Sequence, residues 1–187
     1  IEKETGELLK GNVGQKPKGE PYQSRPLEST KPDTTRYEAL LKEQDGDHKK
    51  AAHEYFREKL QGRHVEAQTD DGTIQACFTG GSWKELKKDM RDDPFKASLV
   101  PHLPDIITTG KYAPETPVHE HSNVIQFHIY RKKVQITDGS KEVIVDVAER
   151  PQANPRFNVY NVNHEGGWKY IERQKKEKNT TDSVPVP

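Results

Sequence analysis

The segment Val124-Ile-Gln-Phe-His-Ile-Tyr130 alternates apolar with polar residues. Successive side chains of a β-strand point to opposite faces of a sheet, so this alternation predicts a strand with one apolar face. Val143-Ile-Val-Asp-Val147 and Phe157-Asn-Val-Tyr160 have the same character. The pattern predicts strands over residues 123–131, 133–137, 142–148 and 156–163.

Turn residues between these segments indicate antiparallel pairing. Asp138-Gly139 separates two of the predicted strands, and Asp-Gly is a preferred dipeptide of two-residue hairpin loops. The same dipeptide at Asp71-Gly72 lies between two alternating segments, residues 65–69 and 74–78, and predicts a further hairpin. A longer turn is expected at Pro151-Gln-Ala-Asn154.

Helical signals lie between the first hairpin and the later strands. Ser82-Trp-Lys-Glu85 has the spacing of a capping box and predicts a helix to about residue 91. Asp93-Pro94 combines an N-cap residue with proline at the first helical position, and Gly110 is expected to end that helical region. Pro101 and Pro104 must kink or break it.

The alternation assigns each strand residue to one of two faces. We expect the apolar face to cover the helices, and it carries Ile125, Phe127, Ile129, Val143, Val145, Val147, Phe157 and Val159. The polar face, where we expect the chemistry, carries Gln126, His128, Tyr130, Asp146, Asn158 and Tyr160. The expected fold class is α+β, with short helices packed on one face of a four- to five-stranded antiparallel sheet.

The ends of the chain differ in composition from its centre. Residues 1–33 are rich in Lys, Glu, Gly and Pro, which predicts a disordered linker. Residues 34–62 predict a helical lead-in, with Asp47 as the N-cap of its second helix. Residues 63–171 are the expected α+β domain, and residues 172–187 a disordered tail.

The 187-residue chain contains 30 basic and 30 acidic residues, so its formal net charge is zero. Such a chain has no global field that attracts nucleic acid or membranes, and any polyanion site must be a local patch.

No segment approaches the ~20 apolar residues of a membrane helix, and none reads as a signal peptide. The lone Cys77 excludes an internal disulfide and is expected to be a buried apolar residue. Because Ile1 opens the chain, we expect a fragment of a longer polypeptide.

His128 and Tyr160 are the first candidates for a catalytic role. Histidine can take or give a proton near neutral pH, and tyrosine can donate to a phosphate oxygen or stack on a base. The opposing interpretation is that His128 is an ordinary strand residue and that the Tyr160 ring packs in the protein.

His119 and His121 are further candidates, because an extended backbone would place both imidazoles on one side. They could act as acid and base, or bind a metal with His128 or Asp146 as a third ligand. Pro114 and Pro117 also allow a solvated loop. Neither spacing is a specific zinc signature, so we expect no metal and no cofactor. His164, near a turn after the last strand, is a weaker candidate.

Arg131, Lys132 and Lys133 form the densest basic cluster of the predicted sheet, and Lys111 follows the helical region. Such residues can bind phosphate, by charge for lysine and by a forked geometry for arginine. The alternative is an edge strand protected from aggregation by its charges. We assign nucleic-acid binding to Lys111, Arg131, Lys132 and Lys133 as a hypothesis.

Four segments carry a resemblance to a known group of domains: Ser98-Leu-Val-Pro-His-Leu-Pro-Asp-Ile-Ile-Thr-Thr-Gly110, Val124–Tyr130, Val143–Val147 and Phe157–Tyr160. Together they resemble the nuclease-like domains of large polyvalent phage proteins and bacterial polymorphic toxins, which are grouped with barnase, EndoU, colicin D and RelE. The resemblance covers about a third of the chain and rests on pattern rather than on a unique motif.

The resemblance implies a toxin-like, metal-independent endoribonuclease that cleaves RNA such as tRNA and is blocked by an immunity or antitoxin protein. It also implies a bacterial origin and action in the cytoplasm of a target cell, after delivery within a larger secreted or phage protein. On this interpretation His119, His121, His128 and Tyr160 are catalytic. The alternatives are a non-enzymatic protein-interaction domain and a metal-dependent enzyme built on His119 and His121.

Overall fold

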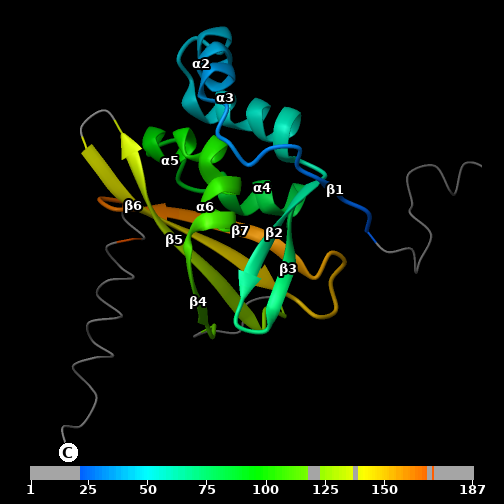
Figure 1. The fold of residues 1–187 in the computed structure, drawn as a ribbon. Coiled ribbons are helices and arrows are strands. Elements are labelled where there is room, and N and C mark those ends of the chain that lie inside the picture. Colours follow the sequence, from blue (N-terminus) through cyan, green and yellow to red (C-terminus); the bar gives the residue numbers. More distant parts are fainter. Residues whose placement is uncertain (1–21, 118–122, 137–138, 168–169, 171–187) are drawn as a thin grey trace, which may run out of the picture.

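The computed structural model describes residues 22–117, 123–136, 139–167 and 170 (Figure 1). Helices gather on one side of a twisted sheet, and α2 and α3 lie farthest from it (Figure 1). The strands are β1 Arg25–Pro26, β2 Arg63–Thr69, β3 Gly72–Phe78, β4 Lys111–Glu115, β5 Gln126–Ile136, β6 Gly139–Glu149 and β7 Phe157–His164. The α+β class predicted from the sequence is confirmed.

The sheet is larger than expected and is mixed. Within the described ranges it contains seven strands in the order β1-β2-β3-β7-β6-β5-β4. β1 pairs with β2 in parallel, and β3 pairs with β7 in parallel through Cys77 and Asn158. The prediction of a four- to five-stranded, purely antiparallel sheet is therefore wrong. A parallel pair needs a long crossover, which short turn signals cannot reveal.

The strand β4 was not predicted. It pairs antiparallel with β5, from Lys111 opposite Arg131 to Glu115 opposite Phe127. Pro114 lowers the strand signal of this segment, but proline is tolerated in a strand at the edge of a sheet, which is where β4 lies. The two strands predicted over residues 123–137 are one continuous strand, β5.

The helical elements are α2 Thr34–Glu43, α3 His48–Tyr55, the π-helical turn η1 Phe56–Leu60, α4 Gly80–Leu86, α5 Pro94–Ser98, the 3₁₀ turn η2 Val100–His102 and α6 Leu103–Thr109. Asp47 and Asp93 are the N-caps of α3 and α5, as predicted. A capping box was predicted to begin at Ser82. It begins three residues earlier, at Thr79, whose side chain accepts a hydrogen bond from the Ser82 backbone amide.

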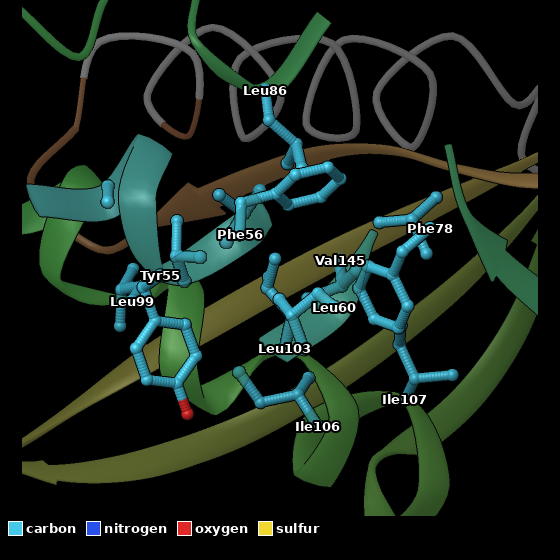
Figure 2. Close-up of a cluster of buried hydrophobic side chains, with 14 of the residues drawn as sticks. Tyr55, Phe56, Leu60, Phe78, Leu86, Leu99, Leu103, Ile106, Ile107 and Val145 are labelled. Carbon is cyan, nitrogen blue, oxygen red and sulfur yellow. The ribbon is translucent and has the colours of Figure 1, made fainter. Parts of the chain in front are cut away.

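The main core joins the helical layer to one face of the sheet. Phe56 and Leu60 lie beside Phe78, Leu103 and Val145 (Figure 2). The helices before residue 63 thus contribute to the same buried cluster as the sheet. The division between a helical lead-in and a domain starting at residue 63 stays a prediction, but their side chains share one core.

The face of β5 that packs against the helices is the opposite of the predicted one. Tyr130 is only 1% exposed and packs in the main core with the valines of β6, whereas Ile129 packs with Ile144 and Tyr170 in a second cluster. Ile125, expected to cover the helices, is 51% exposed. The reason is register, because Tyr130 lies directly opposite Val145 and directly opposed residues share a face.

Candidate functional site

His128 lies at the centre of a hydrogen-bonded group that joins three neighbouring strands. Its Nε2 is 2.8 Å from Glu149 Oε1 at the end of β6, and its Nδ1 is 2.7 Å from Tyr112 Oη on β4. The imidazole is nearly buried, with 7% of His128 exposed. We call Tyr112, His128 and Glu149 the relay.

Arg156 connects the relay to solvent. Its Nε donates to Glu149 Oε2 over 2.9 Å, and a second guanidinium nitrogen binds the same oxygen. The Arg156 side chain is 50% exposed, whereas that of Glu149 is 11% exposed. The guanidinium also lies over the Phe157 ring, and Phe157 meets His128 edge to face. Both His128 and Arg156 are therefore held by aromatic packing as well as by their hydrogen bonds to Glu149.

The surroundings of Glu149 keep its carboxyl group ionised. Burial would raise its pKa, but the hydrogen bonds from His128 and Arg156 outweigh burial and hold the pKa below its ordinary value. A carboxylate only accepts hydrogen bonds, so His128 Nε2 carries a proton. In the neutral ring Nδ1 then accepts a hydrogen bond from the Tyr112 hydroxyl.

The Tyr112 hydroxyl is the end of the relay that lies farthest from Glu149. Burial, followed by the charges of Asp70 and Asp71, raises the pKa of Tyr112, so the phenol is protonated at neutral pH. Tyr130 packs beside it, at 5.4 Å between ring centroids, and donates to the Gln68 carbonyl over 3.1 Å. These contacts bring the tip of the β2–β3 hairpin close to the relay.

This arrangement can move a proton. If a substrate takes up the Tyr112 proton or supplies one, His128 can exchange a proton with the phenol oxygen through Nδ1, and Glu149 stabilises the resulting imidazolium. Arg156 adds a fixed positive charge at the surface. Among the residues that the structure describes, no group of three or more His, Cys, Asp or Glu side chains could hold a metal ion.

Tyr160 does not join His128. It packs against Phe127, with ring centroids 5.2 Å apart, and Arg150 lies over its ring at 5.8 Å. Phe127 belongs to the cluster on the side of the sheet away from the helices, whereas Tyr130, two residues from His128, belongs to the core on the helical side. The two leading candidates from the sequence therefore have different partners and do not share one site.

The predicted basic cluster is also divided between the faces. Lys132 Nζ binds Asp105 and Thr109 of α6, on the helical side. Arg131 and the exposed Lys133 flank Lys132 in β5 and so point to the opposite face of the sheet. Arg131 Nη1 is 3.3 Å from Glu142 Oε1. Lys111 pairs with Arg131 in the register of β4 and β5 and is exposed. Two of the four basic side chains thus have an acidic partner already.

The remaining candidate residues lie away from the relay or outside the residues that the structure describes. His119 and His121 fall outside the described residues. His164 is 6% exposed, and its Nε2 is 2.6 Å from Asp93 Oδ2 at the start of α5. Cys77 is buried, as predicted, and burial raises the pKa of its thiol.

Sequence reasoning missed Tyr112, Glu149 and Arg156. Tyr112 lies in the unpredicted strand β4. Glu149 could have been found, because the antiparallel register of β5 and β6 sets Gln126 opposite Glu149 and makes His128 its diagonal neighbour on one face. Arg156 follows a turn whose geometry no local pattern predicts.

Comparison with known proteins gives one match. The sequence model of a family described as large polyvalent protein-associated domain 3 matches residues 43–160, which is more than half of the chain and includes the relay and Arg156. No curated protein and no solved structure matches the chain. The description agrees with the polyvalent-protein part of the resemblance and names no nuclease.

Across the described residues, every helix is too short or too polar to span a membrane.

Proposed function

The chain belongs to the large polyvalent protein-associated domain 3 family, and from that premise we propose that it is an RNA-cleaving module of a larger polyvalent protein. The relay of Tyr112, His128 and Glu149 supports this proposal, with Nδ1 and Nε2 of His128 both engaged within 2.8 Å. Cleavage of RNA next to a 2′-hydroxyl needs proton transfer and charge stabilisation but no metal, and the relay with Arg156 offers both.

In the proposed reaction the relay acts as the base. Tyr112 accepts the proton of the 2′-hydroxyl as its own proton passes to His128 Nδ1. The 2′-oxygen then bonds to phosphorus, the bond to the 5′-oxygen breaks, and solvent protonates the leaving oxygen. Glu149 stabilises the imidazolium until the ring returns its proton through Tyr112 to solvent, and Arg156 helps to keep Glu149 ionised. The products are a 2′,3′-cyclic phosphate and a 5′-hydroxyl.

The resemblance to toxin domains extends this proposal. It suggests that the module acts on RNA in a target-cell cytoplasm and that an immunity protein blocks it. His119 and His121, predicted to be catalytic, lie outside the described residues and stay a prediction. Tyr160, also predicted to be catalytic, contacts substrate in this proposal and is not part of the relay. The interaction-domain alternative requires an exposed apolar patch, and in the described part of the chain Ile125 is the only exposed large hydrophobic residue. This observation favours the enzyme.

The first test incubates the full chain with total tRNA in excess EDTA and measures fragments with a 2′,3′-cyclic phosphate end. His128→Ala should lower the cleavage rate at least about 100-fold, because general acid and base catalysis contributes that much. Glu149→Gln and Tyr112→Phe should each lower it as well. The matched control is His53→Ala, which removes a histidine stacked on Trp83 in the helical layer.

Wild-type activity in His128→Ala would refute the relay, and intact RNA with the folded wild type would refute the cleavage proposal. Induced expression in a bacterial cytoplasm adds a second readout. Growth should stop with the wild-type chain and with His53→Ala, and continue with His128→Ala.

A further inference from the structure

A cavity of about 340 Å³ lies where β3 and β7 separate, away from the relay. Its walls come from the β6–β7 turn, the start of α4, β7 and the segment before β1. The polar and aromatic side chains that line it include Tyr22, Lys84, Glu85, Arg150, Asn158 and Tyr160. This volume is within the range of small-ligand sites in proteins.

A hydrogen bond joins two elements of the cavity wall that are distant in sequence, and a second bond joins neighbouring residues of that wall. Thr79 Oγ1 donates to Asn158 Oδ1 over 3.0 Å, and Asn158 Nδ2 donates to the Pro155 carbonyl over 2.8 Å. Asn158 therefore ties the β6–β7 turn to the β3–α4 junction. A site whose walls are fixed in this way loses little conformational entropy when it binds a ligand.

One wall of the cavity consists of an aromatic ring and a guanidinium group. The Arg150 guanidinium lies 5.8 Å from the centroid of the half-buried Tyr160 ring. An aromatic ring layered with a guanidinium is a surface on which nucleobases stack. Tyr22 adds a second aromatic ring to the lining.

The charges of the lining favour a single phosphate. Lys84 and Arg150 are cationic, and the one acidic residue of the lining, Glu85, is paired with Lys88 at 2.6 Å. In a chain with no net charge, these two cationic side chains are a local positive region beside an aromatic wall.

We propose that this cavity binds one nucleotide of a single-stranded RNA, with the base stacked on Tyr160 and Arg150 and the phosphate near Lys84 and Arg150. The inference rests on the proposed function for the identity of the strand. The β6–β7 turn links the two sites, since it starts at Glu149 and ends at Arg156, and the Arg150 amide donates to the Arg156 carbonyl over 2.9 Å. A strand that follows this turn reaches both the cavity and the relay.

The test measures binding apart from cleavage. The probe is a fluorescein-labelled single-stranded oligonucleotide with 2′-O-methyl riboses, which lacks the attacking hydroxyl, and fluorescence anisotropy reports its affinity for the full chain. Tyr160→Leu should weaken binding about tenfold, the effect of losing one stacked base. Tyr160→Phe keeps the ring and should bind within about twofold of the wild type.

Arg150→Gln should weaken binding and make it less dependent on salt, because it removes a phosphate contact. The matched control is Arg57→Gln, which removes the same charge from an exposed side chain of η1.

The outcomes separate the two proposals. If Tyr160→Leu and Arg150→Gln both bind as tightly as Arg57→Gln, or if the wild type binds no probe at low salt, the cavity is not a nucleotide site. If the wild type binds in a way that depends on Tyr160 and Arg150 but leaves unmodified RNA intact, the nucleotide site stands and the cleavage proposal fails. If it cleaves RNA while binding is insensitive to both residues, cleavage stands and the nucleotide site fails.

Discussion

At the scale of single residues, Glu149 determines the state of the relay. Both His128 and Arg156 contact its carboxylate, which is nearly buried. A buried carboxylate is costly unless it is paired, so each partner compensates for its desolvation. This charge favours the tautomer of His128 in which Nε2 donates to Glu149.

The lowered pKa of Glu149 makes its contribution to stability depend on pH. Its folded-state pKa lies below the ordinary value of 4.5, so the ionised form stabilises the fold above about pH 4.5. That contribution is lost as the pH falls through the lowered folded-state value. Glu149→Gln should cost about 1–3 kcal/mol at pH 7, and this difference from the wild type should shrink toward pH 3.

Urea denaturation of both proteins across this pH range is the measurement. A difference in unfolding free energy that stays constant down to pH 3 would mean that the folded state does not stabilise the Glu149 carboxylate.

At the scale of elements, Asp93 connects a helix to the sheet. Its Oδ1 accepts from the Lys96 amide and so caps α5, while its Oδ2 binds His164 on β7 at 2.6 Å. Phe95 packs edge to face on the same imidazole. A short helix such as α5 has little stability of its own, so its position depends on contacts of this kind.

Asp93→Ala should therefore destabilise the protein more than an ordinary cap mutation does. Asp47 is the matched control, because it caps α3 in the same way but is exposed. Asp47→Ala should cost about 1 kcal/mol. Asp93→Ala should cost about 1–3 kcal/mol more, since it leaves His164 Nε2 buried without its carboxylate. Equal costs in thermal or urea unfolding would show that the contact with His164 contributes nothing.

At the scale of the whole molecule, the helical layer and the sheet form one core. Phe56 is fully buried, and Leu60 is 2% exposed, in the cluster that also contains Phe78 and Val145 (Figure 2). Large apolar side chains of this kind stabilise a core by several kcal/mol each. The sheet thus relies on helices that precede residue 63.

A chain that begins at Arg63 should fail to fold, because it lacks α2, α3 and η1. Phe56→Ala in the full chain should cost about 3–5 kcal/mol by the same reasoning. The readouts are the near-ultraviolet circular dichroism spectrum of the truncated chain and urea unfolding of the variant. A cooperative thermal transition in the chain from Arg63 onward would contradict this prediction and support a separate helical lead-in.

Local patterns in the sequence were sufficient for local structure. The strands β2, β3, β6 and β7 and the caps at Asp47 and Asp93 depend on residues within a few positions of one another, so short-range rules predict them. The edge strand β4 was missed because proline weakens a pattern that only pairing with β5 completes.

The sequence alone established an α+β chain of strands and capped helices, with His128 on a strand of alternating character. Tertiary pairing settled which face His128 occupies, that β7 returns parallel to β3, and that Tyr112, Glu149 and Arg156 rather than Tyr160 are its neighbours. Alternation marks two faces of a strand without saying which is inward, because register and packing between distant segments decide that.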